Sequence, residues 1–412
     1  MAIVLLIILY TLTFIVLINR LTRSSIIRLT RKEIALAFAF KVAMGVLYGF
    51  VFKEFYGGDD TWKYFNESLN EYNKLSFQTA QFFKEIIPLD SFSKYSAFAD
   101  NFRDFLENLE LNAITKSLAI FNLLSFQNYY ADVVFFNLFS FAGSYLLFKL
   151  FVQYWTEKRL IVYIAAFFIP SAGFWLSGIR GDALLLLSIA LTLYYFNAWM
   201  KQGKAGYLLV FLLGLVGTFI FRLQFFMILI PFLIAWGLSI RFKWKTWLVF
   251  AFTFIGSLVI FFGSAVVFPT SNLTSIVVQK QHEFLTLKGN TVFALNKLEP
   301  NVKSFAVTLP QAALNTFLRP FPWEAKGILQ IAAAAEIVFF WVVTLFAITN
   351  YASIPKISLT WFVIFFCTCT YLLVGYTVPF PGAIVRYKII PELLFFLLLL
   401  PATPLKLKKI YI

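Results

Sequence analysis

The sequence predicts an all-α, polytopic membrane protein with about eleven transmembrane helices. Of its 412 residues, 60% are hydrophobic and only 13% are charged, which is too little polar surface to enclose a water-soluble core. The apolar runs are continuous and long enough to cross roughly 30 Å of hydrocarbon as helices. They do not alternate over segments of about ten residues, and this excludes a β-barrel.

The first expected helix covers residues 2–19 and is followed by a basic stretch. The basic residues there are Arg20, Arg23, Arg28, Arg31 and Lys32. A cleaved signal peptide carries its positive charges before the apolar run, and here the order is reversed. We therefore expect a transmembrane helix with its N-terminus outside and the basic loop in the cytoplasm.

The other expected spans place basic loops on one side of the membrane. These spans are residues 35–53, 130–152, 160–177, 182–199, 206–221, 223–240, 246–267, 328–349, 357–378 and 388–403. The basic residues on the expected cytoplasmic side are Lys158, Arg159, Lys201, Lys204, Arg241, Lys243, Lys245, Lys356, Lys406, Lys408 and Lys409. The net charge of +15 is therefore attributed to topology, and no nucleic-acid partner is expected.

Two long segments fall on the opposite, external side of this single transmembrane domain, residues 1–412. Residues 54–129 are acidic and contain apolar side chains at helical spacing, which predicts amphipathic helices at the membrane surface. Residues 268–327 form the second external segment, and prolines punctuate it.

Two carboxylates, Asp59 and Asp60, follow a pair of glycines directly after the second span. The glycines let the backbone turn sharply at the end of the helix. Trp62 and Tyr64 flank the carboxylates and are candidates for stacking on a sugar or for the interfacial aromatic belt. Two interpretations stay open: a solvated turn, or an external carboxylate that acts as a general base or binds a divalent metal.

Arg180 and Asp182 lie in a very short connection between two spans. Asp182 is expected in the first turn of the next helix, where a carboxylate complements the helix dipole. One interpretation is a capped hairpin with a local ion pair. In the other, Arg180 binds a phosphate bidentately and Asp182 orients it.

Two more arginines are expected on the external side, where the positive-inside rule does not favour them. The apolar stretch 206–240 is about 35 residues, too long for one helix, so the chain should fold back at Arg222. Arg386 and Tyr387 precede the last expected span. Glu392, inside that span, is expected to neutralise one of the basic residues before it.

The sequence gives little reason to expect a metal centre or a cofactor. The lone His282 has no partners at metal-ligand spacing, and no Walker, zinc or dinucleotide-binding motif occurs. No metal site is therefore expected, although a divalent ion at the Asp59–Asp60 pair stays open.

These features resemble the membrane glycosyltransferases of the GT-C superfold. The resemblance rests on the acidic motif at the start of a long first external segment, the amphipathic helices, and Arg386-Tyr387 before a final span. The stretches 174–182 and 318–323 also resemble bacterial envelope-polysaccharide membrane proteins of the polymerase type. One feature departs from the superfold: an extra span precedes the helix that carries the acidic motif.

The resemblance implies roles for the residues of these motifs. Asp60, or Asp59, would be the essential external carboxylate, and Arg180, Arg222 and Arg386 would bind the lipid phosphate. The implied reaction transfers a sugar from a polyprenyl-phosphate-linked donor during envelope polysaccharide or glycan assembly. It would take place at the external face of a bacterial inner membrane.

The main alternative is a transporter or flippase of an anionic lipid-linked saccharide. Such a protein should carry ionisable groups near the middle of the bilayer, often in repeated halves. The charges of this chain are expected to gather at one face, which favours the enzyme. A purely structural membrane subunit would leave the external arginines unexplained.

Overall fold

The computed structural model describes residues 2–269, 272–287, 289 and 291–405, and the regular elements of this part are all helices. The described chain forms two compact units. The first contains residues 2–153 and 166–223, and the second contains residues 154–165 and 224–405. The predicted all-α class is thereby confirmed.

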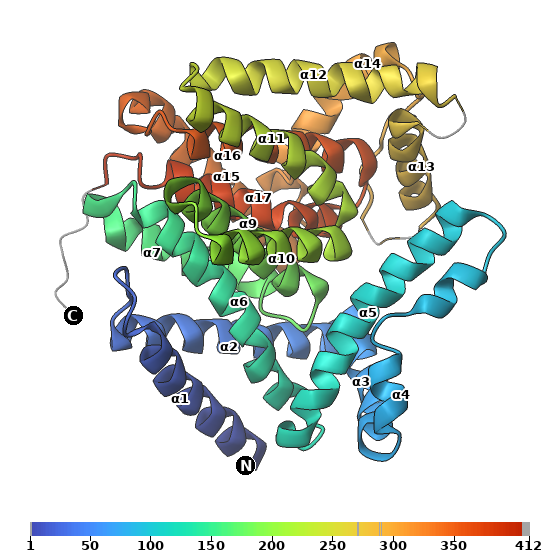
Figure 1. The fold of residues 1–412 in the computed structure, drawn as a ribbon, viewed down its shortest axis with the longest axis vertical. Coiled ribbons are helices and arrows are strands. Elements are labelled where there is room, and N and C mark those ends of the chain that lie inside the picture. Colours follow the sequence, from blue (N-terminus) through green and yellow to red (C-terminus); the bar gives the residue numbers. More distant parts are fainter. Residues whose placement is uncertain (1, 270–271, 288, 290, 406–412) are drawn as a thin grey trace. The chain divides into compact units, whose positions relative to one another are not determined.

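Eight of the described helices are long and apolar enough to cross a membrane (Figure 1). They are α1 (Ala2–Thr22), α2 (Arg31–Tyr56), α6 (Tyr129–Val152), α9 (Gly181–Gln202), α11 (Leu223–Phe242), α12 (Thr246–Val267), α15 (Ile328–Thr349) and α16 (Ser358–Thr377). This pattern is that of an integral membrane protein. The expected number of eleven spans stays a prediction.

The expected span over residues 160–177 is wrong as a single helix. The chain forms α7 (Arg159–Phe167) and a separate short helix, α8 (Pro170–Trp175). Ile169 between them has φ −64° and ψ 122°, because the ring of a following proline excludes the helical conformation. Pro170 then occupies the start of α8, where its missing N–H is no loss.

In the first unit, α2 begins and ends with strong local signals. Thr30 and Glu33 form a reciprocal capping box: the Thr30 hydroxyl accepts from the Glu33 N–H, and the Glu33 carboxylate accepts from the Thr30 N–H. At the other end, Gly57 and Gly58 have φ of 69° and 101°. The turn expected from these two glycines is confirmed, and it places Asp59 directly beyond it.

The core of the first unit is built on α6, which packs against both α2 and α9. Gly45 of α2 lies against Val133 and Asn137 of α6. Lys41, one helical turn away, is buried and donates to the Ser140 hydroxyl at 2.9 Å. The Lys41 ammonium therefore pairs with a polar group of α6 within the unit rather than facing lipid.

The expected break at Arg222 is also confirmed. Helix α10 (Ala205–Phe221) ends immediately before it and α11 begins at Leu223. Arg222 itself has an extended backbone, with φ −157° and ψ 90°. At 17 residues, α10 is shorter than the usual length of a transmembrane helix.

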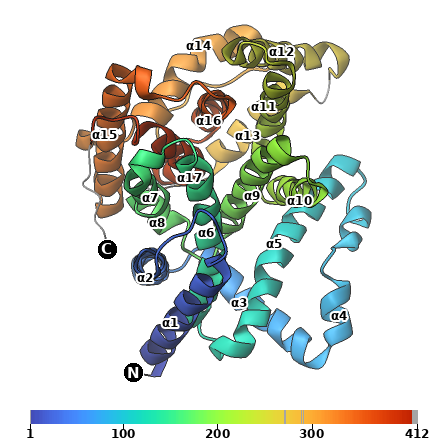
Figure 2. The same cartoon turned by 60° about the vertical axis from the view of Figure 1, so that its left-hand side comes forward.

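The segment expected to be external, residues 54–129, contains three α-helices: α3 (Asp60–Phe77), α4 (Thr79–Lys84) and α5 (Phe98–Ser125). Helix α5 packs along α3 (Figure 2). Lys116 of α5 ties the three together, since its ammonium contacts Glu71 at 2.5 Å and the Phe82 carbonyl at 3.0 Å. Helices are present in this segment as predicted, whereas their amphipathic character and their external position stay predictions.

The second unit contains α11, α12, α15 and α16 together with α17 (Pro381–Leu399). Its long connection, residues 268–327, includes α13 (Leu273–Thr286) and α14 (Val302–Ala313). A π-helical turn, η3 (Leu314–Leu318), follows α14 directly. The predicted basic residues Lys406, Lys408 and Lys409 lie outside the described residues.

The last helix begins earlier than predicted. We expected a span over residues 388–403 with Arg386 and Tyr387 in front of it, but α17 starts at Pro381. Proline is favoured at the first position of a helix, and its fixed φ starts the helix there. Arg386 and Tyr387 are therefore helical residues, about one and a half turns inside α17.

Candidate functional site

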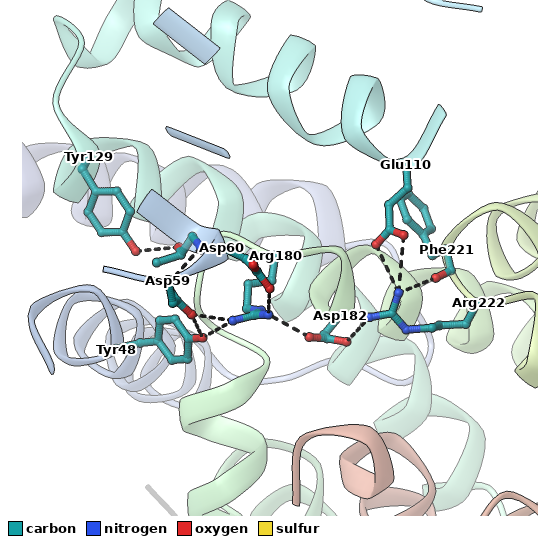
Figure 3. A network of polar contacts seen from close by, with 10 residues as sticks. Tyr48, Asp59, Asp60, Glu110, Tyr129, Arg180, Asp182, Phe221 and Arg222 are labelled. Atoms are coloured by element: carbon teal, nitrogen blue, oxygen red, sulfur yellow. Dashed lines mark hydrogen bonds and ion pairs between the residues drawn. The ribbon is translucent and has the colours of Figure 1, made fainter. Parts of the chain in front are cut away.

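The acidic motif sits at the junction of α2 and α3, where local chemistry fixes the first carboxylate. Asp59 is the N-cap of α3, and its Oδ1 accepts from the Thr61 N–H at 3.0 Å. Its Oδ2 accepts from the Tyr48 hydroxyl at 2.8 Å and from Arg180 Nη1 at 2.5 Å. Both carboxylate oxygens of Asp59 therefore accept hydrogen bonds (Figure 3).

Arg180 is the buried centre of this group. Its Nη1 also donates to the Tyr48 hydroxyl at 2.6 Å, its Nη2 donates to Asp60 Oδ2 at 2.6 Å, and its Nε lies 3.6 Å from Asp182 Oδ2. Burial by itself would lower the pKa of the guanidinium. The Tyr48 hydroxyl and three surrounding carboxylates outweigh burial, so the pKa is raised and the group stays charged.

Asp182 connects this cluster of charged residues to a second arginine, Arg222. It lies in the first turn of α9, as predicted, where the helix dipole favours a carboxylate. Its Oδ1 is 3.3 Å from Arg222 Nη2. Arg222 Nη1 in turn contacts Glu110 of α5 at 3.3 and 3.4 Å and the Phe221 carbonyl at 2.9 Å. Figure 3 shows the resulting row, in which Asp182 lies between the two guanidinium groups.

The carboxylates of this row differ in exposure. The side chain of Asp182 is 4% exposed and that of Asp59 is 16% exposed, whereas Asp60 is 52% exposed. Glu110, at 20%, is also partly open to solvent. The two more accessible carboxylates are therefore Asp60 of α3 and Glu110 of α5.

Five residues singled out in the sequence are brought together here: Asp59, Asp60, Arg180, Asp182 and Arg222. Arg180 is not confined to a local pair with Asp182, because its shortest ionic contacts are to the two aspartates of the α2–α3 junction. The interpretation as an isolated, capped hairpin is therefore insufficient.

The aromatic residues of the acidic motif are engaged within the fold. The Trp62 ring stacks on Tyr129 with centroids 3.9 Å apart, and its Nε1 donates to the Gly49 carbonyl at 3.0 Å. The Lys53 ammonium also lies 4.5 Å from its ring centroid. These contacts make Trp62 an anchor of α3 on α2 and α6. Tyr64, one helical half-turn on, is partly exposed on α3.

Arg386 and Tyr387 belong to the second unit, on α17. The Arg386 guanidinium lies 5.4 Å from the centroid of the neighbouring Tyr387 ring. Their expected membership in the same site as Arg180 and Arg222 stays a prediction, as does the shared cavity.

Two members of the network, Tyr48 and Glu110, were not singled out from the sequence. Glu110 lies four residues after the buried Leu106 on the same face of α5, so a charged residue on an apolar stripe was the available signal. A Cβ at Gly181 would approach Glu110 Cδ to 3.3 Å, so the glycine gives Glu110 room beside α9. Tyr48 gave no such signal, because tyrosine is common in membrane helices.

The polar side chains of this site are mainly carboxylates paired with guanidinium groups. Among the residues that the structure describes, no three His, Cys, Asp or Glu side chains are grouped so as to hold a metal ion. The carboxylates and guanidinium groups of the row can themselves supply charge pairing, anion binding and proton transfer at a carboxylate.

No family model matches the chain, and neither the curated proteins nor the solved structures give a match. The resemblance to the GT-C superfold thus rests on the motifs named above.

Proposed function

We propose that the protein is a membrane glycosyltransferase that uses a polyprenyl-phosphate-linked sugar donor in envelope polysaccharide or glycan assembly. The observation that carries the proposal is the row Arg180–Asp182–Arg222 with the exposed Asp60 at its edge. Two guanidinium groups held by one buried carboxylate suit a phosphate, and the exposed carboxylate suits a general base.

The contacts of Arg180 suggest how a phosphate enters. Tyr48 and Asp182 hold the guanidinium from buried positions and Asp59 holds it from a partly buried one, whereas Asp60 contacts it from the exposed side. An incoming phosphate replaces Asp60 as the counter-ion at Nη2. The displaced Asp60 carboxylate is then next to the phosphate and free to face the acceptor hydroxyl, which couples donor binding to the positioning of the base.

In the transfer step, the acceptor hydroxyl oxygen forms a bond to the anomeric carbon of the donor. The bond between that carbon and the phosphate oxygen breaks, and its electron pair leaves with the lipid phosphate. Asp60 takes the hydroxyl proton. Arg180 and Arg222 stabilise the charge that develops on the leaving phosphate, where fixed positive groups lower a barrier most.

The proposed base is tested by Asp60→Asn in purified protein supplied with a polyprenyl-linked sugar donor. The amide keeps the shape but has almost no basicity, so sugar transfer should fall by about 10²–10⁴-fold while donor binding is retained. Asp90→Asn is the matched control, because Asp90 is an exposed aspartate of the same segment. Transfer at the wild-type rate by Asp60→Asn would reject this role.

The phosphate contact is tested by Arg222→Ala. This change removes an interaction with the donor itself, so binding and turnover should fall together, unlike the result for Asp60→Asn. If Arg222→Ala binds the donor as tightly as the wild type does, the row is a structural ion-pair network and not a phosphate site.

A transporter of an anionic lipid-linked saccharide is the second candidate, and one observation favours it. Lys388 lies seven residues after the start of α17 and Glu392 seven before its end, and they pair at 3.6 Å with both side chains buried. Glu336 of α15 is also buried and interacts electrostatically with Lys388. Ionisable groups in the middle of apolar helices are typical of transport pathways.

The two candidates are separated by measuring both activities on one preparation. Proteoliposomes that contain lipid-linked saccharide report movement across the bilayer, and the same vesicles with an acceptor report sugar transfer. Transfer that is lost in Asp60→Asn supports the enzyme. Movement without any transfer, lost on replacing Lys388 and Glu392 together, would assign the protein to transport.

A further inference from the structure

The second unit contains an apolar cavity at the point where α11 leads into α12. Its volume is about 580 Å³, a size that is usual for ligand pockets. The lining includes Leu238 of α11, Trp244 and Lys245 of the connection, and Leu248 and Phe252 of α12. Trp244 and Phe252 are 58% and 69% exposed. The cavity is therefore open to the surroundings of the two helices and offers them mainly apolar walls.

Basic residues are concentrated in the connection beside this cavity. Arg241, Lys243 and Lys245 lie within five consecutive residues, and all three are exposed. The start of α16 lies at the same end of α11, because the Ser358 hydroxyl is 2.8 Å from a serine hydroxyl in the last turn of α11. Lys356, two residues before Ser358, is also exposed. Four basic side chains thus lie at one end of this group of helices.

The start of α12 adds a second attraction for an anion. Lys245 is the N-cap of this helix, and a lysine side chain has no acceptor atom with which to cap it. The first N–H groups of a helix have no partner within the helix and carry partial positive charge, so a phosphate is favoured beside them. A lysine at the same end is unfavourable unless an anion accompanies it.

The ionic surroundings of this connection differ from those of the Arg180–Arg222 row. Among the residues that the structure describes, no ion pair includes Arg241, Lys243 or Lys245. In the row, by contrast, carboxylates contact both guanidinium groups. Three positive charges within five residues repel one another, and a bound anion offsets that repulsion. The connection can therefore bind an anion without first breaking an ion pair of its own.

We propose that this site binds an anionic phospholipid, with the headgroup phosphate at the connection and an acyl chain in the cavity. Phosphate suits the connection, because ammonium and guanidinium groups and a helix N-terminus all attract it. An acyl chain suits the apolar walls. Trp244 and Trp247 are 58% and 51% exposed, and exposed tryptophans at the end of a membrane helix are typical of the headgroup level.

The positive-inside rule explains only part of this arrangement. It accounts for basic residues in a short loop on the expected cytoplasmic side. It requires neither an apolar cavity beside them nor a lysine at a helix N-terminus. Basic pockets beside transmembrane helices on this side are typical sites for anionic lipid headgroups.

The headgroup contact is tested with the purified full-length chain in a neutral detergent, with lipid binding followed by native mass spectrometry. Phosphatidylglycerol should bind with saturation, and phosphatidylcholine should bind far more weakly. In Lys243→Gln/Lys245→Gln the affinity for phosphatidylglycerol should fall about 30-fold, from the usual contribution of each basic residue near a membrane surface. Equal binding of the two lipids, or an unchanged affinity in this variant, would overturn the proposal.

The acyl-chain contact is tested by Leu248→Trp, which fills the cavity without changing its charge. The larger side chain should keep about two methylene groups of the lipid in water, so the affinity for phosphatidylglycerol should fall about tenfold. An affinity equal to that of the wild type would show that the acyl chain lies elsewhere, and the cavity would be rejected as its site.

A matched control removes two charges from another part of the same unit, with Lys297→Gln/Lys303→Gln. Both lysines are exposed and neither lines the cavity, so the affinity should stay near that of the wild type. An equal loss in this control would reduce the effect of Lys243→Gln/Lys245→Gln to general surface charge and overturn the site.

Inorganic phosphate distinguishes a lipid from a soluble anion. If phosphate alone saturates the site and phosphatidylglycerol adds nothing, the site binds a free anion and the lipid assignment is wrong. Thermal unfolding of each variant in lipid-free detergent serves as the folding check, and replacement of the exposed lysines should leave the midpoint near the wild-type value. If Leu248→Trp unfolds early, Thr253→Phe replaces it, because Thr253 lines the same cavity.

Discussion

Asp182 is the residue on which the arrangement of the two arginines depends. It is 4% exposed and lies within 3.3–3.6 Å of both guanidinium groups. Without it, two positive charges would face each other at the ends of neighbouring helices with their shared counter-ion missing. The position of Asp182 in the first turn of α9 adds the attraction of the helix dipole to this role.

Asp182→Asn should therefore lower stability as well as weaken the site. Hydrogen bonds to charged groups contribute about 1.5–3 kcal/mol each when buried, so a loss in this range is expected. Denaturant unfolding in detergent, followed by tryptophan fluorescence, measures it. Asp100→Asn is the control, because Asp100 forms an exposed pair with Arg103 and should change stability by no more than about 0.5 kcal/mol. Equal losses of stability in Asp182→Asn and Asp100→Asn would refute the role of Asp182 as the shared counter-ion of Arg180 and Arg222.

At the scale of elements, the close approach of α2 to α6 positions the acidic motif. Gly45 and Gly49 of α2 lie against side chains of α6, including Val133 and Tyr129. Small residues let membrane helices approach closely. Because α2 leads directly into the Gly57–Gly58 turn, the packing of α2 on α6 determines the positions of Asp59 and Asp60.

Gly45→Ala should separate α2 from α6. The added Cβ would lie 2.7 Å from both Val133 Cγ1 and Asn137 Nδ2, and overpacking of this kind costs about 1–3 kcal/mol. Gly256→Ala in α12 is the control, because nothing lies within 4 Å of its Cβ position. That change should be neutral or stabilise by up to about 1 kcal/mol. Thermal unfolding compares them, and equal midpoints would disprove the tight contact.

At the scale of the molecule, the direction of insertion decides whether the proposed site faces the outside. The basic α1–α2 turn predicts a cytoplasmic position, and residues 54–129 are then external. Every proposed role of Asp60 and the two arginines depends on this orientation, because a lipid-linked donor would have to reach them from the external leaflet.

Cysteine labelling in intact cells tests the orientation. In a background with Cys367 and Cys369 replaced by serine, Ser93→Cys should react with a membrane-impermeant thiol reagent and Ser24→Cys should not. Both serines are exposed, so access across the membrane is the difference between them. After permeabilisation both should react. Labelling of Ser24→Cys in intact cells would reverse the topology and place the row of arginines in the cytoplasm.

The sequence by itself determined the features that rest on composition and on short-range chemistry. Apolar runs of membrane length predicted the helical membrane class, because unpaired backbone groups are not tolerated in hydrocarbon. The two glycines predicted the turn before Asp59, and the excess length of the stretch 206–240 predicted the break at Arg222. The split before Pro170 was not predicted, because the apolar run 160–177 is continuous, although proline does restrict the residue before it.

The tertiary structure alone decided which charges meet. Glu110 is 112 positions from Arg222, and Tyr48 is 132 positions from Arg180, so no spacing rule connects either pair. The same holds for Lys388 and the carbonyl of Thr316 in η3. Local chemistry fixes where a helix starts and ends, but partners so far apart are selected only when packed helices bring their side chains within a few ångströms.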